Sequence, residues 1–550
     1  MFRPFAWLLI AALALPSLAF AQAAAGGPAL GFASAGANFA ALRSSGAVSV
    51  KLIADWSSLE PTKGRFAWKP LDDAIAGATA AGLRVVIVLT YTPKWASLAT
   101  GAELNNPQIY SHQPAKRIAD WEAFVTAIVG RYKTKVRDWQ VWTALSLPLY
   151  RGTTSDYLAL LRAARARSKA ADPASRIVLS TPLGVDLASV RRALAAAGGA
   201  FDAVSLHPQG ISPEAMMRYL AVLRERVLGP SPKQIWMEWD PRSVGDASTW
   251  ASQMTKVLAV SRAFGVDQVF WAAPPSPEIQ AARRTFEERV GSRPFVGYIE
   301  RPGAVVLAFG EAPTSLVAWR TGAETQVDVE PAASIFAPSG ENRPQAAAGD
   351  TLTVTLTAEP LLITDAGTAI AAAAKATFQT RGLPLPPSTR SFAAAAEVSA
   401  RLGRANVENG LYNMPFRDRR NGAVEVVDVD GSEAVRTNAS KDIVFVYFDV
   451  DDTFLFFVDN RAAVEVSIEV RGAGAPQQLG FNLLYDSTTG YRFTPWHWVE
   501  PAQAWVTYTF RITDANFANT WGWDFAINAG GNRREDLTIR TVTVRKVVNP

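Results

Sequence analysis

The sequence predicts a multidomain protein whose largest unit is a closed (β/α)8 TIM barrel. Eight short apolar segments recur between residues 29 and 298. Segments with apolar residues at the i, i+3, i+4 spacing of a helix lie between them. Each strand of such a barrel is buried on both faces, so its strands are expected to be continuously apolar. A doubly wound open sheet is the alternative, but no glycine-rich phosphate loop follows the first segment.

The eight expected strands are residues 30–33, 48–55, 84–90, 136–143, 176–181, 201–207, 234–240 and 266–273. Alanine- and arginine-rich segments at 156–171 and 248–264 are typical of the helices between them. Residues 29–298 are therefore expected to form the whole barrel.

Three further segments follow the barrel. Residues 299–366 contain short strands separated by Gly, Pro and Asn turns, which predicts a small antiparallel β-sandwich. Residues 367–395 are rich in Ala and Pro and are expected to form a linker. Residues 396–550 contain many alternating strands, which predicts a jelly-roll β-sandwich. The run YFDVDDT at 447–453 resembles carbohydrate-binding jelly-roll domains.

The N-terminus has the features of a secretory signal peptide over residues 1–21. Arg3 precedes an apolar stretch, and Ala19-Phe20-Ala21 supplies small residues at the cleavage site. A membrane anchor is the alternative, but the apolar run is shorter than the ~20 residues that span a bilayer. We expect a periplasmic or secreted protein with no membrane span after signal removal.

Composition narrows the possible ligands. The chain of 550 residues has no cysteine, which excludes disulfides and thiolate metal sites. Its net charge of +5 is weak for this length, and no basic stripe with interleaved aromatics indicates nucleic-acid binding. We expect neither a cofactor nor a catalytic metal. Asp449, Asp451 and Asp452 are candidates for a structural calcium site, with solvated loop carboxylates as the alternative.

Candidate site residues lie where the expected strands end, since TIM barrels carry their sites at that face. Glu238 lies in an otherwise apolar strand, where an ionised carboxylate needs a partner, either substrate or a structural salt bridge. His207 ends the sixth strand as a substrate contact or as a structural histidine. Trp271, Trp56 and Trp95 are candidates for sugar stacking or, alternatively, for the core.

Several motifs, in their order along the chain, resemble one family. They are WSSLEPTKGRFAW at 56–68, TPKWA at 92–96, FDAVSLHP at 201–208 and WME at 236–238. Together they resemble clan A glycoside hydrolases, most closely family 39 and its bacterial exopolysaccharide-associated relatives, over roughly residues 29–366. The resemblance implies a carbohydrate ligand, either a polysaccharide or an oligosaccharide. The residues expected to contact it are Trp271, His207, Trp56, Trp95, Thr143, Lys51 and Asp240.

The resemblance also implies a retaining mechanism, in which a nucleophilic Glu and an acid/base Glu lie ~5–5.5 Å apart. Glu238 matches the nucleophile position. The acid/base position is degenerate and reads Ala144, after Thr143 in place of Asn. Lys51 replaces an Arg of the second strand, and Gln209 replaces a Tyr. Because general acid–base catalysis contributes ~10²–10⁴-fold, we expect natural glycosidic bonds to be cut slowly or not at all.

Three hypotheses follow. The first is an exported, catalytically impaired protein that binds a bacterial polysaccharide in exopolysaccharide assembly or retention. The second is an active retaining glycosidase or transglycosidase with Glu238 as nucleophile and a relocated acid, for which Asp240, Asp55 and Asp186 are candidates. The third is a structural adhesion protein. In the C-terminal unit, Trp496, Trp498, Trp521 and Trp523 are expected to form either a sandwich core or, if exposed, a sugar-stacking or docking patch.

Overall fold

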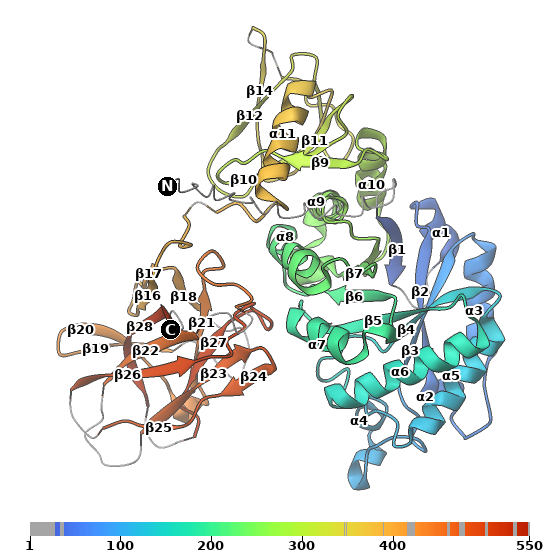
Figure 1. The fold of residues 1–550 in the computed structure, drawn as a ribbon, viewed down its shortest axis with the longest axis horizontal. Helices are drawn as coiled ribbons and strands as arrows, with labels where there is room; N and C mark the ends of the chain where they lie inside the picture. The colour runs from blue at the N-terminus through green and yellow to red at the C-terminus, as the bar shows by residue number, and fades with distance from the viewer. Residues whose placement is uncertain are drawn as a thin grey trace, which may run out of the picture.

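The computed structural model describes residues 28–33, 38–345, 347, 349–388, 390–414, 424–458, 463–471, 479–500, 504–531 and 536–547. The expected signal segment, residues 1–21, lies outside these ranges. No helix in the described ranges has both the length and the hydropathy to cross a bilayer. In Figure 1 the barrel lies at the right, a smaller β unit lies above it, and a C-terminal β unit lies to its left.

Eight parallel strands close into a barrel, in which β1 pairs with both β2 and β8, as the sequence predicts. The strands are β1 Ala29–Ala33, β2 Ser49–Asp55, β3 Arg84–Thr90, β4 Val136–Val141, β5 Arg176–Leu183, β6 Ala203–His207, β7 Gln234–Trp239 and β8 Gln268–Trp271.

Helices surround the barrel and cover the outer faces of its strands (Figure 1). They are α1 Phe39–Ser44, α2 Trp56–Leu59, α3 Lys69–Ala80, α4 Pro107–Tyr110, α5 Ile118–Tyr132, α6 Thr154–Ala171, α7 Leu187–Ala197, α8 Pro213–Val222, α9 Trp250–Ala263 and α10 Pro277–Arg289. Short helical turns occur at η1 Gly101–Asn105, η2 Gly198–Ala200, η3 Leu223–Leu228, η4 Pro241–Ser243 and η5 Ala247–Thr249.

Alternation along each strand separates an inner from an outer set of side chains. On β2, Val50 and Leu52 belong to the large core between strands and helices, whereas Lys51 points inward. Inside the barrel a separate apolar layer consists of Val86, Val178, Ala203, Trp236 and Phe270. Ile53, two residues beyond Lys51 on the inner side, is 44% exposed, so the barrel is open to solvent at the C-terminal ends of its strands.

The small β unit follows the barrel and has its own apolar core. Its described strands form one sheet in the order β13-β15-β11-β10-β9 and a β12-β14 pair. They are β9 Phe295–Tyr298, β10 Ala304–Phe309, β11 Ser315–Arg320, β12 Gln326–Val329, β13 Ser334–Phe336, β14 Leu352–Thr355 and β15 Leu361–Thr364.

The segment expected to be a linker, residues 367–395, differs from that expectation in its first half. Residues Thr368–Arg381 form helix α11, with Ala371 and Ala374 buried. Alanine has the highest intrinsic helix propensity, and its small side chain lets α11 lie close to β9. The alanine run that resembled low complexity is therefore a helix packed on the small β unit (Figure 1).

The C-terminal unit has two antiparallel sheets that share one apolar core. The first contains β16 Glu397–Arg401, β17 Val407–Asn409, β19 Glu425–Val429, β20 Ser432–Arg436, β22 Ala463–Arg471, β26 Trp505–Ile512 and β28 Thr538–Val547. The second contains β18 Leu411–Met414, β21 Phe445–Val450, β23 Gly480–Ser487, β24 Gly490–Phe493, β25 His497–Trp498 and β27 Phe525–Asn528, and η6 Ala439–Lys441 is a short turn. The jelly-roll assignment stays a prediction.

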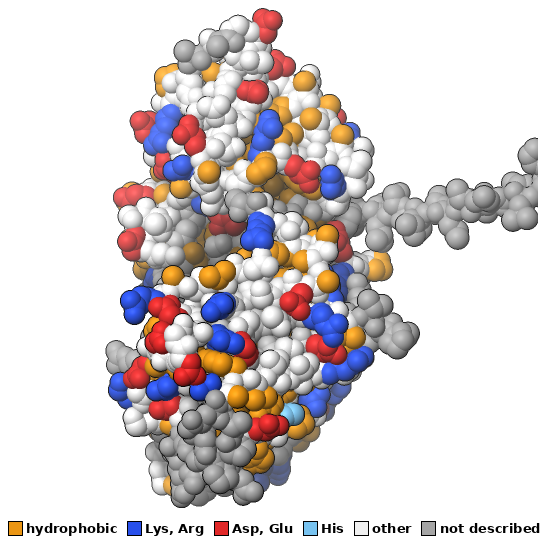
Figure 2. Space-filling model, turned by 90° about the vertical axis from the view of Figure 1, so that its left-hand side faces the viewer, with side chains coloured by type: hydrophobic (Ala, Val, Ile, Leu, Met, Phe, Trp, Pro, Cys, Tyr) orange, Lys and Arg blue, Asp and Glu red, His pale blue; other side chains and the backbone are white. Residues whose placement is uncertain are grey.

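The outer face of the two β units carries charges of both signs. In Figure 2, Lys and Arg side chains lie among Asp and Glu over most of the visible described surface. Mixed charge of this kind does not favour a polyanion on this face.

Candidate functional site

Glu238 points into the barrel from the end of β7 and forms an ion pair with Lys51 of β2. Lys51 Nζ lies 2.8 Å from Glu238 Oε2 and 3.1 Å from Ser205 Oγ. The lysine side chain is buried, while the glutamate side chain keeps 28% of its surface exposed. The ammonium group also lies over the ring of Phe270, 4.4 Å from its centroid. Glu238 is therefore a fixed carboxylate that remains open to the mouth of the barrel.

The ion pair sets the protonation state of Glu238. Burial alone raises the pKa of its carboxyl group, but Lys51, with a further contribution from His207, lowers it below the ordinary value. Burial also lowers the pKa of Lys51, and Glu238 opposes that change. The result is an ionised carboxylate, which is the form that a nucleophile or an electrostatic stabiliser requires.

His207, at the end of β6, lies beside the same carboxylate. Its Nε2 is 3.9 Å from Glu238 Oε2, and its Nδ1 is 3.4 Å from Thr181 Oγ1. Burial lowers the pKa of His207 to about 4, with Lys51 adding to the shift and Glu238 opposing it. The imidazole is thus neutral at neutral pH and can donate or accept a single hydrogen bond at Nε2.

Residue 144, which the resemblance implies as the acid/base position, follows β4 at the same face of the barrel. Trp142 follows β4 with φ of 67°, and Tyr91 follows β3 with φ of 62°. A bulky residue in this left-handed region is strained, and such strain is concentrated at functional sites. Ala144 comes two residues after Trp142 and is 3% exposed. A methyl group therefore occupies the position where the resemblance implies a proton donor.

The three candidates for a relocated acid all have structural partners. Asp55 caps α2, accepting hydrogen bonds from Ser57 and Ser58. Asp240 is paired with Arg242, with 2.8 Å between Oδ1 and Nε. Asp186 caps α7 and lies 3.8 Å from Arg192. Each of these carboxylates therefore has a local structural role.

The tryptophans expected at the sugar site are placed differently from the expectation. Trp56 and Trp271 have no exposed surface, so neither presents a ring face to a ligand in this structure. Trp56 stacks on Phe124 at 5.0 Å, and its Nε1 donates to Glu60. Trp271 lies on the outer side of β8 because alternation along this strand turns its neighbour Phe270 inward. Trp95 is half-buried, and its Nε1 donates to the Glu60 carbonyl.

Two inward residues were not singled out from the sequence. Phe270 is paired in register with Glu238 and forms the floor under Lys51, and Ile53 is an exposed apolar side chain in the mouth. Residues paired in a parallel sheet point to the same face of that sheet. If Glu238 points inward, its partner in the β7–β8 register, Phe270, is therefore predicted to point inward as well. The strand pattern alone did not distinguish Phe270 from Trp271, since both are large aromatics.

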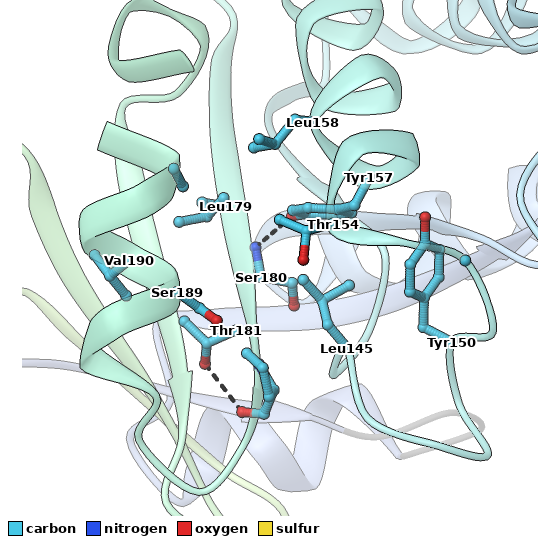
Figure 3. Close-up of a pocket in the computed structure, with 13 residues that line it drawn as sticks. Leu145, Tyr150, Thr154, Tyr157, Leu158, Leu179, Ser180, Thr181, Ser189 and Val190 are labelled. Atoms are coloured by element: carbon cyan, nitrogen blue, oxygen red, sulfur yellow. Dashed lines mark hydrogen bonds between the residues drawn. The ribbon is translucent and has the colours of Figure 1, made fainter. Parts of the chain in front are cut away.

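A cavity of about 80 Å³ lies behind the loop that follows β4 (Figure 3). Leu145 and Tyr150 of this loop, Tyr157 of α6 and Val190 of α7 point into it. The Ser180 amide donates to the Tyr157 hydroxyl at 2.7 Å. Small-molecule pockets usually have ~300 Å³ or more, and the Lys51–Glu238 pair does not line this space. The cavity is therefore too small for a sugar ring and is separate from the Lys51–Glu238 pair.

The C-terminal candidates divide into exposed and buried groups. Trp498 and Trp521 are each 58% exposed, whereas Trp523 is 4% exposed. Trp496 is half-buried and meets Trp498 edge-on. Neither the core nor the patch interpretation holds for all four tryptophans.

The aspartates considered for calcium have protein partners. Asp451 accepts hydrogen bonds from Thr453 and the Tyr412 hydroxyl, and Asp452 pairs with Arg218 of α8 at 3.1 Å. Burial, with Asp452 adding to it, raises the pKa of Asp449 to about 7. In the described part of the chain, no group of three or more His, Cys, Asp or Glu is placed to hold a metal ion.

Comparison with solved structures supports the fold. A family 39 glycoside hydrolase from Bacteroides cellulosilyticus has a TM-score of 0.51 and 17% identity, covering 61% of this chain and 81% of that one. A GH30 endoxylanase from Clostridium papyrosolvens has a TM-score of 0.46 and 14% identity, covering 62% and 96%. A GH30 xylanase from Clostridium acetobutylicum has a TM-score of 0.43 and 13% identity, covering 62% and 98%.

No family profile and no curated protein matches the sequence. At identities this low the first structure shows a shared fold alone, and the other two scores carry no argument. That first structure is itself a glycoside hydrolase, so its fold agrees with the fold that the resemblance implies. The closeness to family 39 and the loss of the acid/base residue stay predictions.

Proposed function

We propose that this chain is an exported protein that binds a bacterial polysaccharide in the mouth of its barrel and cuts glycosidic bonds poorly. The observation that carries the proposal is the Lys51–Glu238 pair, with Ala144 at the end of β4. Its role would be the assembly or retention of exopolysaccharide in the periplasm or outside the cell. The glycoside-hydrolase fold and the open mouth support carbohydrate as the ligand.

The chemistry of this arrangement supports slow turnover. An ionised Glu238 has the charge needed to attack an anomeric carbon. A natural sugar leaving group must also be protonated as it departs, and Ala144 has no proton to donate. The loss corresponds to about 3–5 kcal/mol of barrier, at roughly 1.36 kcal/mol per decade of rate. Binding in the groove would survive this loss, because binding does not need the acid.

Activated substrates test whether Glu238 reacts. The dinitrophenyl group of an activated aryl glycoside departs without being protonated. A panel of such glycosides therefore needs no proton donor at residue 144. We expect mass spectrometry to detect a covalent glycosyl adduct on Glu238 and azide to speed its release. Glu238→Gln is the control and should carry no adduct. Absence of the adduct across the panel would contradict a reactive role of Glu238. The binding function would then be tested separately, by measuring the affinity of the protein for polysaccharides.

Placing an acid at residue 144 tests whether the lack of a proton donor there limits hydrolysis. Ala144→Glu combined with Thr143→Asn is expected to raise hydrolysis of natural oligosaccharides by about 10²-fold or more, since general acid catalysis contributes ~10²–10⁴-fold. Thermal unfolding shows whether the buried replacement still folds. Rapid hydrolysis of the same oligosaccharides by the unmodified protein would instead support the alternative, an active glycosidase with a relocated acid.

A further inference from the structure

One loop of the C-terminal unit lies at the rim of the barrel mouth. A Cβ atom built on Gly184, directly after β5, would lie 2.8 Å from the carbonyl oxygen of Thr520. The Gly184 amide donates to the carbonyl of His207 at 2.8 Å. On α8, the Tyr219 hydroxyl donates to the carbonyl of Ala518 at 2.9 Å. The loop that carries Ala518 and Thr520 therefore packs next to the strand end that holds His207 beside Glu238.

Trp521 follows Thr520 and presents an open aromatic face. Its ring stacks on Tyr491 with centroids 3.9 Å apart and an interplanar angle of 27°. The Tyr491 hydroxyl donates to the Trp523 carbonyl and accepts from the Trp521 amide. Because Tyr491 covers one face while 58% of Trp521 is exposed, the exposed surface belongs to the other face and the ring edge.

The loop is held in this conformation from within the C-terminal unit. The buried Asp486 carboxyl accepts from the Ala518 amide at 3.1 Å and from Thr520 Oγ1 at 3.0 Å. Asp524 accepts from the Asn519 amide at 3.1 Å. These bonds hold Phe517 and Asn519 at positive φ, a conformation that non-glycine residues seldom adopt. The ring of Trp521 is thus oriented before any ligand binds, which lowers the entropy cost of binding.

We propose that Trp521 is a sugar-stacking subsite at the rim of the barrel. A polysaccharide chain would then extend from Glu238, in the mouth of the barrel, onto the C-terminal unit. This inference rests on the proposed function and adds a second, distant contact to it. A rigid aromatic ring with one free face packs against the apolar C–H face of a pyranose. A single ring among polar loops is small against the ~800 Å² per partner of a stable protein interface, which favours a sugar chain as the occupant.

The C-terminal unit supplies a matched control. Trp498 has the same exposed fraction as Trp521, 58%. It lies on β25, at the lower edge of the C-terminal unit in Figure 1, away from the barrel. Trp521→Ala and Trp498→Ala therefore remove equal amounts of exposed aromatic surface, but only the first removes it from the rim.

The test uses the full mature chain and affinity gels cast with a panel of soluble bacterial and plant polysaccharides. For a polysaccharide that retards the wild type, we expect Trp521→Ala to weaken affinity roughly tenfold and Trp498→Ala to leave it unchanged. Oligosaccharides cut from that polysaccharide add a length series. The Trp521→Ala effect should appear with long fragments and vanish with fragments too short to reach from Glu238 to the rim.

The outcomes separate the inference from the proposed function. Retardation of the wild type with no effect of Trp521→Ala would overturn the subsite and leave the polysaccharide-binding proposal standing. An equal effect of both tryptophan variants would also overturn it, since the rim would then have no special role. No retardation by any polysaccharide of the panel would count against the proposed function as well.

Discussion

At the scale of single residues, Lys51 decides the chemistry of the site. Its buried ammonium group compensates the desolvation of Glu238 and keeps that carboxylate ionised. A buried ion pair contributes little net stability, but removing one partner leaves an uncompensated charge. His207 contributes no charge at neutral pH, because burial lowers its pKa to about 4. At neutral pH the charges within this group of three side chains are therefore those of Lys51 and Glu238.

Replacing the lysine tests this balance. We expect Lys51→Met to cost about 2 kcal/mol of unfolding free energy, less than the ~3–5 kcal/mol typical of broken buried pairs. We expect the smaller cost because 28% of the Glu238 side chain is exposed, so water partly solvates the unpaired carboxylate. The variant should also raise the pKa of Glu238, since the charge that lowers it is gone. Urea unfolding measures the stability change.

A second substitution provides the control. Adding Glu238→Gln removes the unpaired charge, so the double variant should recover most of the stability lost in Lys51→Met. A double variant no more stable than Lys51→Met would show that the lysine acts through packing against Phe270 rather than through its charge.

At the scale of elements, α11 shows how a low-complexity segment becomes part of a folded unit. Gly297 of β9 lets the helix backbone approach, because a Cβ at this position would lie 2.0 Å from the carbonyl oxygen of Ala374. The partner on the helix is also small, since Ala371 and Ala374 are its buried residues. Close contact between this glycine and the alanines brings the helix against β9, and Phe378 of α11 adds an edge-on contact with Phe295 of β9, with ring centroids 5.4 Å apart.

Gly297→Ala is expected to separate α11 from β9 and destabilise the small β unit by about 1–3 kcal/mol, as overpacking does. Hydrogen exchange of the α11 amides should become faster, which locates the effect. Gly130→Ala is the matched control, since a Cβ there meets nothing within 4 Å in helix α5. It should stabilise by up to about 1 kcal/mol through helix propensity. Unchanged exchange in α11 of Gly297→Ala would refute the close-packing argument.

At the scale of the whole molecule, buried carboxyl groups lie where the C-terminal unit meets the barrel. Asp452 pairs with Arg218 of α8, and Asp486 holds the loop that contacts Gly184 and Tyr219. Burial, with nearby Asp186 adding to it, raises the pKa of Asp486 to about 7. Burial raises the pKa of Asp452 to about 6, opposed by Arg218. The contact between the two units is thus coupled to proton binding.

The sign of this coupling gives a pH prediction. Between about pH 4 and pH 7 the unfolded chain releases a proton that the folded Asp486 retains, so stability falls as pH rises. Each pKa unit corresponds to about 1.36 kcal/mol. We expect the wild type to lose more stability between about pH 5 and pH 8 than Asp486→Asn, measured by urea unfolding. Equal losses in both proteins would show that Asp486 does not titrate in this range.

The fold was predictable from the sequence to a large extent, because it depends on local patterns. The eight continuously apolar strands and the helical spacing between them specify the barrel, and they also place Glu238 near the end of its seventh strand. Backbone geometry sets the spacing of apolar residues in strands and helices. This spacing can be recognised in the sequence without knowing what each strand contacts.

The tertiary structure decided which side chains meet. Lys51 and Glu238 are 187 residues apart, and only barrel closure brings them to 2.8 Å. Register turned Phe270 inward and Trp271 outward, and the docking of the C-terminal unit brought the loop of Thr520 against Gly184 at the end of β5. Contacts of this kind depend on how distant segments of the chain are placed relative to one another. The spacing of apolar residues in a strand or helix does not encode that placement, because it describes only neighbours along the chain.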